Sequence, residues 1–237
     1  MPDPVLAADI ATLQADRIQK LNDLHDDYEH TRKLWKMLRA EVQRYGKHVT
    51  FHNPNTGTRA DAVQLAGRTG AVLRRLNEQT FKDIIAQFEL FTSDLLRLWL
   101  AAHISLVEGK ALSIRTLFAS NSLQDLRQAA LREAVESTIL KRAYSRPADW
   151  FRYIHEILGN LVVATNDVET FAEMKATRDV LEHAGGIANA TYREKAGRAA
   201  RVNVGASVNV SDDYHIEAFR LVRKLIEDLA NAAIAAA

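Results

Sequence analysis

The sequence predicts an all-α fold, and two observations carry that prediction. Apolar residues recur at three- to four-residue spacing through nearly the whole chain, which places them on one face of a helix. Glycine and proline are scarce, at 10 and 4 of 237 residues, so few segments carry helix breakers. One short stretch departs from this pattern. Residues 201–210, RVNVGASVNV, alternate valines around Gly205 and could form a small hairpin.

The first expected element is a long N-terminal helix. Asp3 caps it, Pro4 occupies its first position, and the apolar spacing continues to about residue 45. A turn-rich loop, residues 46–60, follows. The N-terminal part of the chain is therefore expected to be helix 4–45 plus loop 46–60.

The helical pattern resumes at Asp61, is weakened at Gly67 and Gly70, and strengthens from Ala71 to about Trp99. This segment is apolar over more than one stripe, as expected for the central helix of a bundle. The remaining helices are expected over residues 122–144, 146–158, 166–184 and 189–197, and from about residue 211 to the tail. No repeat or linker interrupts them, so residues 1–237 are expected to form one domain.

Composition excludes several classes of protein. The absence of cysteine rules out a disulfide scaffold, a Cys-type zinc site, an iron–sulfur cluster and a cysteine nucleophile, and it fits a cytoplasmic location. The formal charge of +1 gives no global field that would point to nucleic acid. The most apolar stretch, residues 95–107, is interrupted by Arg97 and His103 and is too short to cross a membrane, so no membrane span is expected.

The histidines do not predict a metal site. His48 and His52 lie four residues apart in the loop, without acids at ligand spacing, and are expected to be exposed. His25 and His30 lie among acids of the first helix, which favours a solvated polar face. We therefore expect neither a metal nor a cofactor.

One motif stands out near the end of the helix 166–184. Arg178 and His183 enclose four residues, the first of which is Asp179, and Gly185-Gly186 ends the helix directly afterwards. The spacing of Arg and His alone is expected by chance about twice in this composition. The polar residue after the Arg and the four-residue gap make the full pattern much rarer. His183 falls at a helix C-terminus, where the helix dipole favours a cation.

The motif Arg178-Asp179-x-x-x-His183 resembles the Arg-polar-x(3)-His signature of the HEPN superfamily (higher eukaryote and prokaryote nucleotide-binding domains). The C-terminal location, the glycine pair, the short helix that follows and the long last helix match as well. Residues 87–102 are similar to the acid-bearing central helix of HEPN ribonucleases of the RiboL-PSP type. The resemblance covers about residues 71–235 and does not extend to the first 60 residues.

The resemblance implies a metal-independent endoribonuclease. It also implies a helical bundle that forms a homodimer with the two motif helices face to face. The implied setting is a bacterial toxin or a phage-defence nuclease, for which a cognate antitoxin or defence partner is expected. The residues fit this chemistry. His183 suits a proton shuttle for attack by the ribose 2′-OH, Arg178 suits a phosphate oxygen, and Asp179 could orient either one. Charge and position near the motif predict the RNA-binding residues: Lys175, Tyr192 as a stacking ring, Arg193, Lys195, Arg198 and Arg201.

Two alternatives to an endoribonuclease remain open at this point. The chain could be a non-catalytic HEPN-like module that binds RNA, a nucleotide or a partner protein. It could also be an unrelated helical scaffold in which Arg178 forms a plain surface pair with Glu182, four residues further along the helix.

Overall fold

The computed structural model describes residues 3–45, 50–107, 122–143 and 146–237, and within them the fold is all-α. The predicted connection 108–121 and residues 46–49 of the predicted loop lie outside the described residues. The helices match the predicted ranges closely: α1 Pro4–Tyr45, α2 Ala62–Gly67, α3 Thr69–Ala102, α5 Leu123–Ala143, α6 Pro147–Leu158, α7 Thr165–His183, α8 Ala190–Ala196 and α9 Asp212–Ala236.

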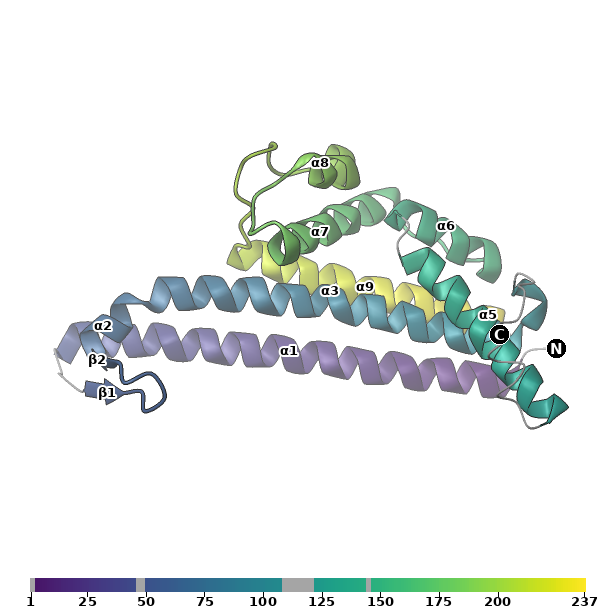
Figure 1. Ribbon diagram of the computed structural model, residues 1–237, viewed down its shortest axis with the longest axis horizontal. Coiled ribbons are helices and arrows are strands. Elements are labelled where there is room, and N and C mark those ends of the chain that lie inside the picture. Colours follow the sequence, from purple (N-terminus) through teal and green to yellow (C-terminus); the bar gives the residue numbers. More distant parts are fainter. Residues whose placement is uncertain (1–2, 46–49, 108–121, 144–145) are drawn as a thin grey trace.

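Three long helices, α1, α3 and α9, pack side by side and form the base of the molecule (Figure 1). The apolar stripes of all three meet in one core that contains Phe81, Phe88, Leu95 and Leu225. The prediction that α3 is central holds because it contacts both other long helices and also α5 and α7. Its N-terminal neighbour α2 is a separate short helix, because the helix is interrupted at Arg68, between Gly67 and Gly70.

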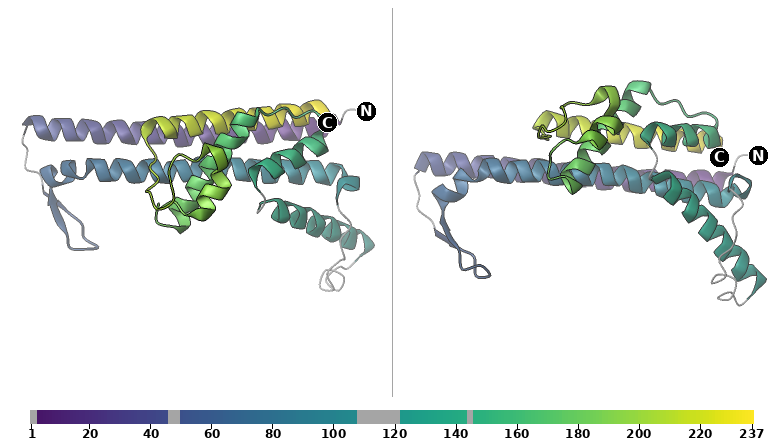
Figure 2. Two further views of the ribbon diagram at one scale, coloured as in Figure 1. Left: turned by 90° about the horizontal axis from the view of Figure 1, so that it is seen from above. Right: turned by 45° about the horizontal axis from the view of Figure 1, so that its top comes forward.

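The helices α6, α7 and α8 lie over one side of this base (Figure 2). The helix α7 contacts α3 and α9 below it and α8 beside it. It ends as the glycine pair predicts: Gly185 and Gly186 have positive φ of 60° and 78°, and the Gly186 N–H donates to the carbonyl of Val180. The last turn of α7, with His183, is thereby fixed at the surface.

The hairpin predicted at residues 201–210 does not form. Val208 and Val210 do point inward, at 4% and 1% exposed, but residues 205–208 form no ladder within their own segment and pair with residues 186–188 after the end of α7. A hairpin occurs elsewhere, inside the segment that we expected to be only a loop. It consists of β1 Thr50–His52 and β2 Arg59–Asp61, paired antiparallel.

The distal end of α1 lacks the cover that its apolar spacing predicts. The helix α9 reaches only as far as Asp212, which pairs with Arg32 and Lys36. Beyond that point Val42 of α1 is buried against α2, but two other apolar residues stay exposed: Leu38 is 38% and Tyr45 is 56% exposed. We call residues 37–45 and 50–75 the arm. It projects from the body at the end where the hairpin lies (Figure 1).

The first-helix histidines divide between the surface and the interior. His30 is exposed as expected, but His25 is half-buried, and its ring stacks on Phe219 of α9 at 4.2 Å between centroids. The acids around it in the sequence point outward, so the polar-face prediction is wrong for His25. Tyr28 and His215 continue the same stack, which joins α1 to α9.

A buried carboxylate, Glu173 of α7, organises the segment that carries α8. Its side chain is 3% exposed and accepts hydrogen bonds from Thr177, from the hydroxyls of Tyr192 and Tyr214, and from Arg201 at 3.0 Å. Burial raises the pKa of both tyrosine hydroxyls, so both remain donors. One carboxylate thus links α7 to α8, to residue 201 and to α9.

We predict that Arg201→Met lowers the free energy of unfolding by about 2 kcal/mol, because it leaves the Glu173 carboxylate without its cation. The value is below that for a fully buried pair, since the Arg201 side chain reaches solvent. Urea denaturation measures the effect. The control is Arg198→Met, whose partner Glu169 lies at the surface and whose loss should leave the midpoint unchanged. Equal midpoints for the two variants would contradict the role given to Arg201.

Candidate functional site

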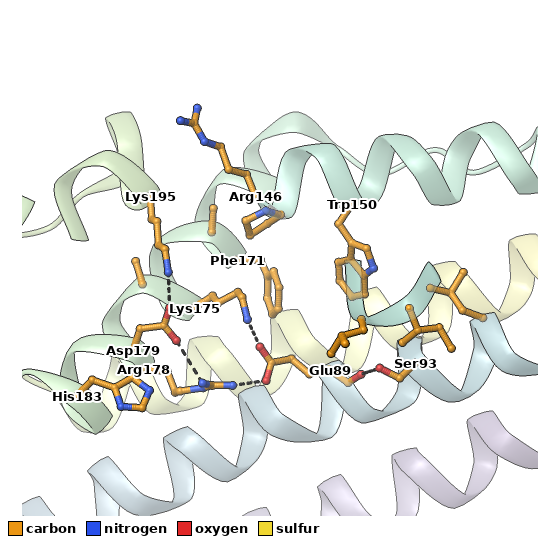
Figure 3. Close-up of a pocket in the computed structure, with 16 residues that line it drawn as sticks. Glu89, Ser93, Arg146, Trp150, Phe171, Lys175, Arg178, Asp179, His183 and Lys195 are labelled. Atoms are coloured by element: carbon orange, nitrogen blue, oxygen red, sulfur yellow. Dashed lines mark hydrogen bonds and ion pairs between the residues drawn. The ribbon is translucent and has the colours of Figure 1, made fainter. Parts of the chain in front are cut away.

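A cleft of about 490 Å³ lies between α3, α5, α6 and α7, with Lys195 of α8 at its rim. It contains the whole predicted motif: Arg178, Asp179 and His183 line it, as does Lys175. Figure 3 shows Lys175 and Arg178 of α7 reaching the acid Glu89 of α3, with His183 on the far side of Arg178. The predicted catalytic residues are therefore together in one chain and in one cleft.

The helical geometry of α7 explains why these residues converge. At about 100° per residue, positions 175, 178, 179 and 183 fall within about 140° of one another around the helix axis. The buried residues Met174 and Val180 lie outside this arc and pack against the apolar core. The polar positions are therefore turned toward the cleft by the packing of the apolar ones.

Glu89 is the acid that receives both cations of the motif helix. One carboxylate oxygen pairs with the Lys175 ammonium and the other with the Arg178 guanidinium. All three side chains are only partly exposed, between 20% and 30%. Arg178 is thereby held across the gap between α3 and α7, in contact with a pair of anionic oxygens such as it would also find on a phosphate.

Asp179 forms the second half of the same network. Its Oδ1 accepts from Arg178 Nη1 at 3.2 Å, and its Oδ2 accepts from Lys195 Nζ at 2.8 Å. Of the two residues that Asp179 could orient, Arg178 and His183, the first is the one it contacts. No contact joins Asp179 to His183 among the described residues. The imidazole of His183 is exposed at the charged end of the cleft, and its ring has no hydrogen bond to a described residue.

The other end of the cleft is apolar. Leu96, Ile139, Pro147 and Phe171 line it, and so does Trp150, whose half-buried ring meets Phe88 edge-on at 5.3 Å. In Figure 3, Trp150 and His183 stand at opposite ends of the row of side chains. The cleft thus offers charge at one end and an aromatic surface at the other, the two kinds of contact that a nucleotide needs for its phosphate and its base.

The residues predicted to bind RNA are divided by the structure. Lys175 and Lys195 line the cleft, but Tyr192 is 1% exposed and gives its hydroxyl to Glu173, so its ring offers no face to a base. Arg201 pairs with Glu173 and lies over the Tyr214 ring at 3.4 Å. Two further predicted residues are exposed outside the cleft lining: Arg193, and Arg198, which pairs with Glu169.

Sequence reasoning missed Glu89 and Trp150 as parts of the site. Glu89 lay in the segment singled out as acid-bearing, but the spacing within α3 does not show that it faces α7. Trp150 follows Pro147 on α6 and had no distinguishing neighbour. The surface-pair alternative for Arg178 is wrong, because Glu182 pairs with Lys82 at 3.0 Å, and this hydrogen bond holds the Glu182 pKa below its usual value.

Comparison with known proteins gives no match: no family model, no curated protein and no solved structure matches the chain. Across the described ranges, none of the helices is both long and apolar enough to span a bilayer. Within the same ranges, no three His, Asp or Glu side chains are grouped as a metal ion would need. The geometry of the cleft is therefore the basis for a functional proposal.

We predict that Glu89→Gln strengthens binding of inorganic phosphate by about tenfold, or about 1.4 kcal/mol, because it removes the anion that competes for Lys175 and Arg178. Isothermal titration calorimetry at low salt measures the change. The control Glu169→Gln removes an acid of α7 that pairs outside the cleft, and it should leave the affinity as it is. Equal or weaker binding by Glu89→Gln would show that phosphate does not bind at these cations.

Proposed function

We propose that this protein is a HEPN-type endoribonuclease that cleaves RNA by attack of the ribose 2′-OH, without a metal. The observation that supports this most is the cleft in which Arg178, Asp179 and His183 of α7 meet Lys175, Lys195 and Glu89 beside an apolar, aromatic end. An RNA phosphate fits the charged end, and a base fits the end with Trp150. Trp150 takes the stacking role that Tyr192 cannot fill.

The chemistry assigns one role to each group. The imidazole of His183 accepts the proton of the attacking 2′-OH or donates a proton to the leaving 5′ oxygen. Arg178 binds the phosphate oxygens through its planar fork and stabilises the charge that grows on them. Asp179 positions both Arg178 and Lys195. The phosphate exchanges places with the Glu89 carboxylate, so the cations are in position before RNA arrives.

The remaining parts of the proposal follow from the resemblance to HEPN proteins. We propose a homodimer that joins the two motif helices and sets two clefts at one seam. A single chain already brings Arg178 and His183 into one cleft, so the dimer would add a second set of charges instead of completing the first. The setting we propose is a cytoplasmic toxin or phage-defence nuclease with a cognate antitoxin or defence partner.

The alternative is a non-catalytic HEPN-like module that binds RNA, a nucleotide or a partner protein at the same cleft. One observation favours it: Glu89 already occupies the guanidinium of Arg178, as it would in a site used only for regulated binding. Binding without cleavage separates this alternative from the nuclease.

We predict that the purified protein cleaves total RNA in the presence of a chelator and leaves 2′,3′-cyclic phosphate ends, because the nucleophile is the RNA's own hydroxyl. The His183→Ala variant should be inactive. The control His30→Ala removes an exposed histidine of α1 and should keep full activity. Activity that is lost in chelator and restored by magnesium or manganese would contradict the mechanism, and intact RNA bound by the wild type would favour the alternative.

We predict that Arg178→Lys slows the single-turnover rate about 100-fold with little loss of RNA binding. The charge is retained, but the fork that follows the phosphate into its transition state is absent, an effect on the scale of one oxyanion donor. Arg193→Lys, an exposed residue outside the cleft lining, is the matched control and should cleave at the wild-type rate. A wild-type rate for Arg178→Lys would place the phosphate-binding group elsewhere.

A further inference from the structure

The arm carries a concentration of positive charge that the composition of the whole chain hides. Its described residues include six arginines and only two acids, Glu41 and Asp61. That gives the arm a formal charge of +4, whereas the whole chain has +1, so the remainder of the chain is negative. The arginines are distributed over α1, β2, the start of α3 and the turn before it: Arg39, Arg44, Arg59, Arg68, Arg74 and Arg75.

These six arginines differ from those at the cleft in what they contact. Each is exposed, and none forms an ion pair or a side-chain hydrogen bond with a described residue. At the cleft, by contrast, Arg146 pairs with Glu194 and Arg178 pairs with Glu89. Unpaired charges of one sign on a projecting element repel one another, and a polyanion relieves that repulsion. The guanidinium is the cation best matched to phosphate oxygens.

The arm's charge is continuous with the cleft. Arg75, Lys82 and Glu89 of α3, and Arg68 directly before its first residue, are spaced by seven residues, so they follow one stripe with a drift of about 20° per step. Lys82 pairs with Glu182 at the end of α7. The stripe therefore leads from the arm, past the end of the motif helix, to the carboxylate that holds Arg178.

A second cleft, of about 700 Å³, makes the same connection. Arg74 and Arg75 line one side of it, and Gly185 and Gly186, directly after His183, line another. This cleft, which Glu78 also lines, thus places the two arginines beside the residues that directly follow the motif helix. Arg75 lies about 21 Å from Glu89 along the helix axis, and Arg68 about 32 Å, at about 1.5 Å per residue.

We propose that the arm is the RNA-binding surface of this protein: it holds the phosphate backbone of a strand that continues out of the cleft. This inference rests on the proposed function for the identity of the polyanion. The exposed Met37 and Leu38 on the same helix make an acidic protein and an anionic membrane the alternatives that the test must separate.

The test measures binding of a labelled RNA of about 20 nucleotides to the protein in the His183→Ala background, where the RNA stays uncut, by fluorescence anisotropy. Two variants remove arm charge, Arg68→Gln/Arg75→Gln and Arg39→Gln/Arg44→Gln. The matched control, Arg127→Gln/Arg220→Gln, removes two exposed, unpaired arginines from α5 and α9. All six substitutions lie at exposed positions, so the melting temperature of each variant should equal that of its parent.

We expect each arm variant to weaken binding about tenfold and to reduce the slope of log K against log salt by about 0.7 for each phosphate that is no longer neutralised. The control should do neither. A dinucleotide covers about 7 Å at a helical spacing of about 3.4 Å, and even when stretched to twice that length it is too short to reach from the cleft to Arg75. As a competitor it should bind all variants equally.

Wild-type binding of the long RNA by both arm variants, or an equal reduction in the control, would overturn the proposal. So would arm-dependent binding of poly-glutamate or phosphatidylserine vesicles with no effect on RNA, which would make the partner an acidic protein or a membrane. The two proposals fail separately. If RNA binding depends on the arm but the wild-type protein does not cleave RNA, the proposal for the arm holds and the nuclease proposal fails. If the protein cleaves RNA but the arm variants bind it normally, the nuclease proposal holds and the proposal for the arm fails.

Discussion

The carboxylate of Glu173 is the interaction on which the geometry of the site depends. A single buried charge is costly unless every oxygen finds a donor. Here the donors come from α7 itself, α8, residue 201 and α9. Because α7 cannot rotate without breaking these bonds, the face that carries Lys175, Arg178 and His183 is fixed toward α3. The proposed chemistry uses one face of α7, and the hydrogen bonds to Glu173 on the opposite face fix the direction in which the first face points.

Glu89 and Glu173 show two uses of an acid within one fold. Glu173 is enclosed and serves the structure, whereas Glu89 is partly open to solvent and meets side chains that can turn to another anion. Their depth separates the roles: a bond to Glu173 must be kept for the packing to survive, and a bond to Glu89 can be exchanged. The backbone of the site is therefore held in place by Glu173, whereas the carboxylate of Glu89 can be replaced by another anion.

The helices were predictable from the sequence because apolar spacing is a local property of each segment. The glycine pair after His183 and the cap at Ser211 are local in the same way. The polar partners were not predictable, since Glu89 and Arg178 are 89 residues apart and spacing does not tell which helix faces which. Tyr192 and Arg201 were misjudged for the same reason: their sequence neighbours are basic and exposed, while their partners lie on α7 and α9.

The packing of α9 against α1 has a consequence for synthesis of the chain. The hydrogen bond from Tyr28 to Asp212 joins residues 184 apart, and α9 leaves the ribosome after α1, α3 and α7. Until α9 docks, Tyr214 cannot reach Glu173, and α7 lacks part of the surface on which it packs. The motif residues of α7 are therefore synthesised before α9, the helix that completes the hydrogen bonds holding them in orientation. For a protein proposed to cut RNA, that order delays the assembled centre until α9 has been synthesised.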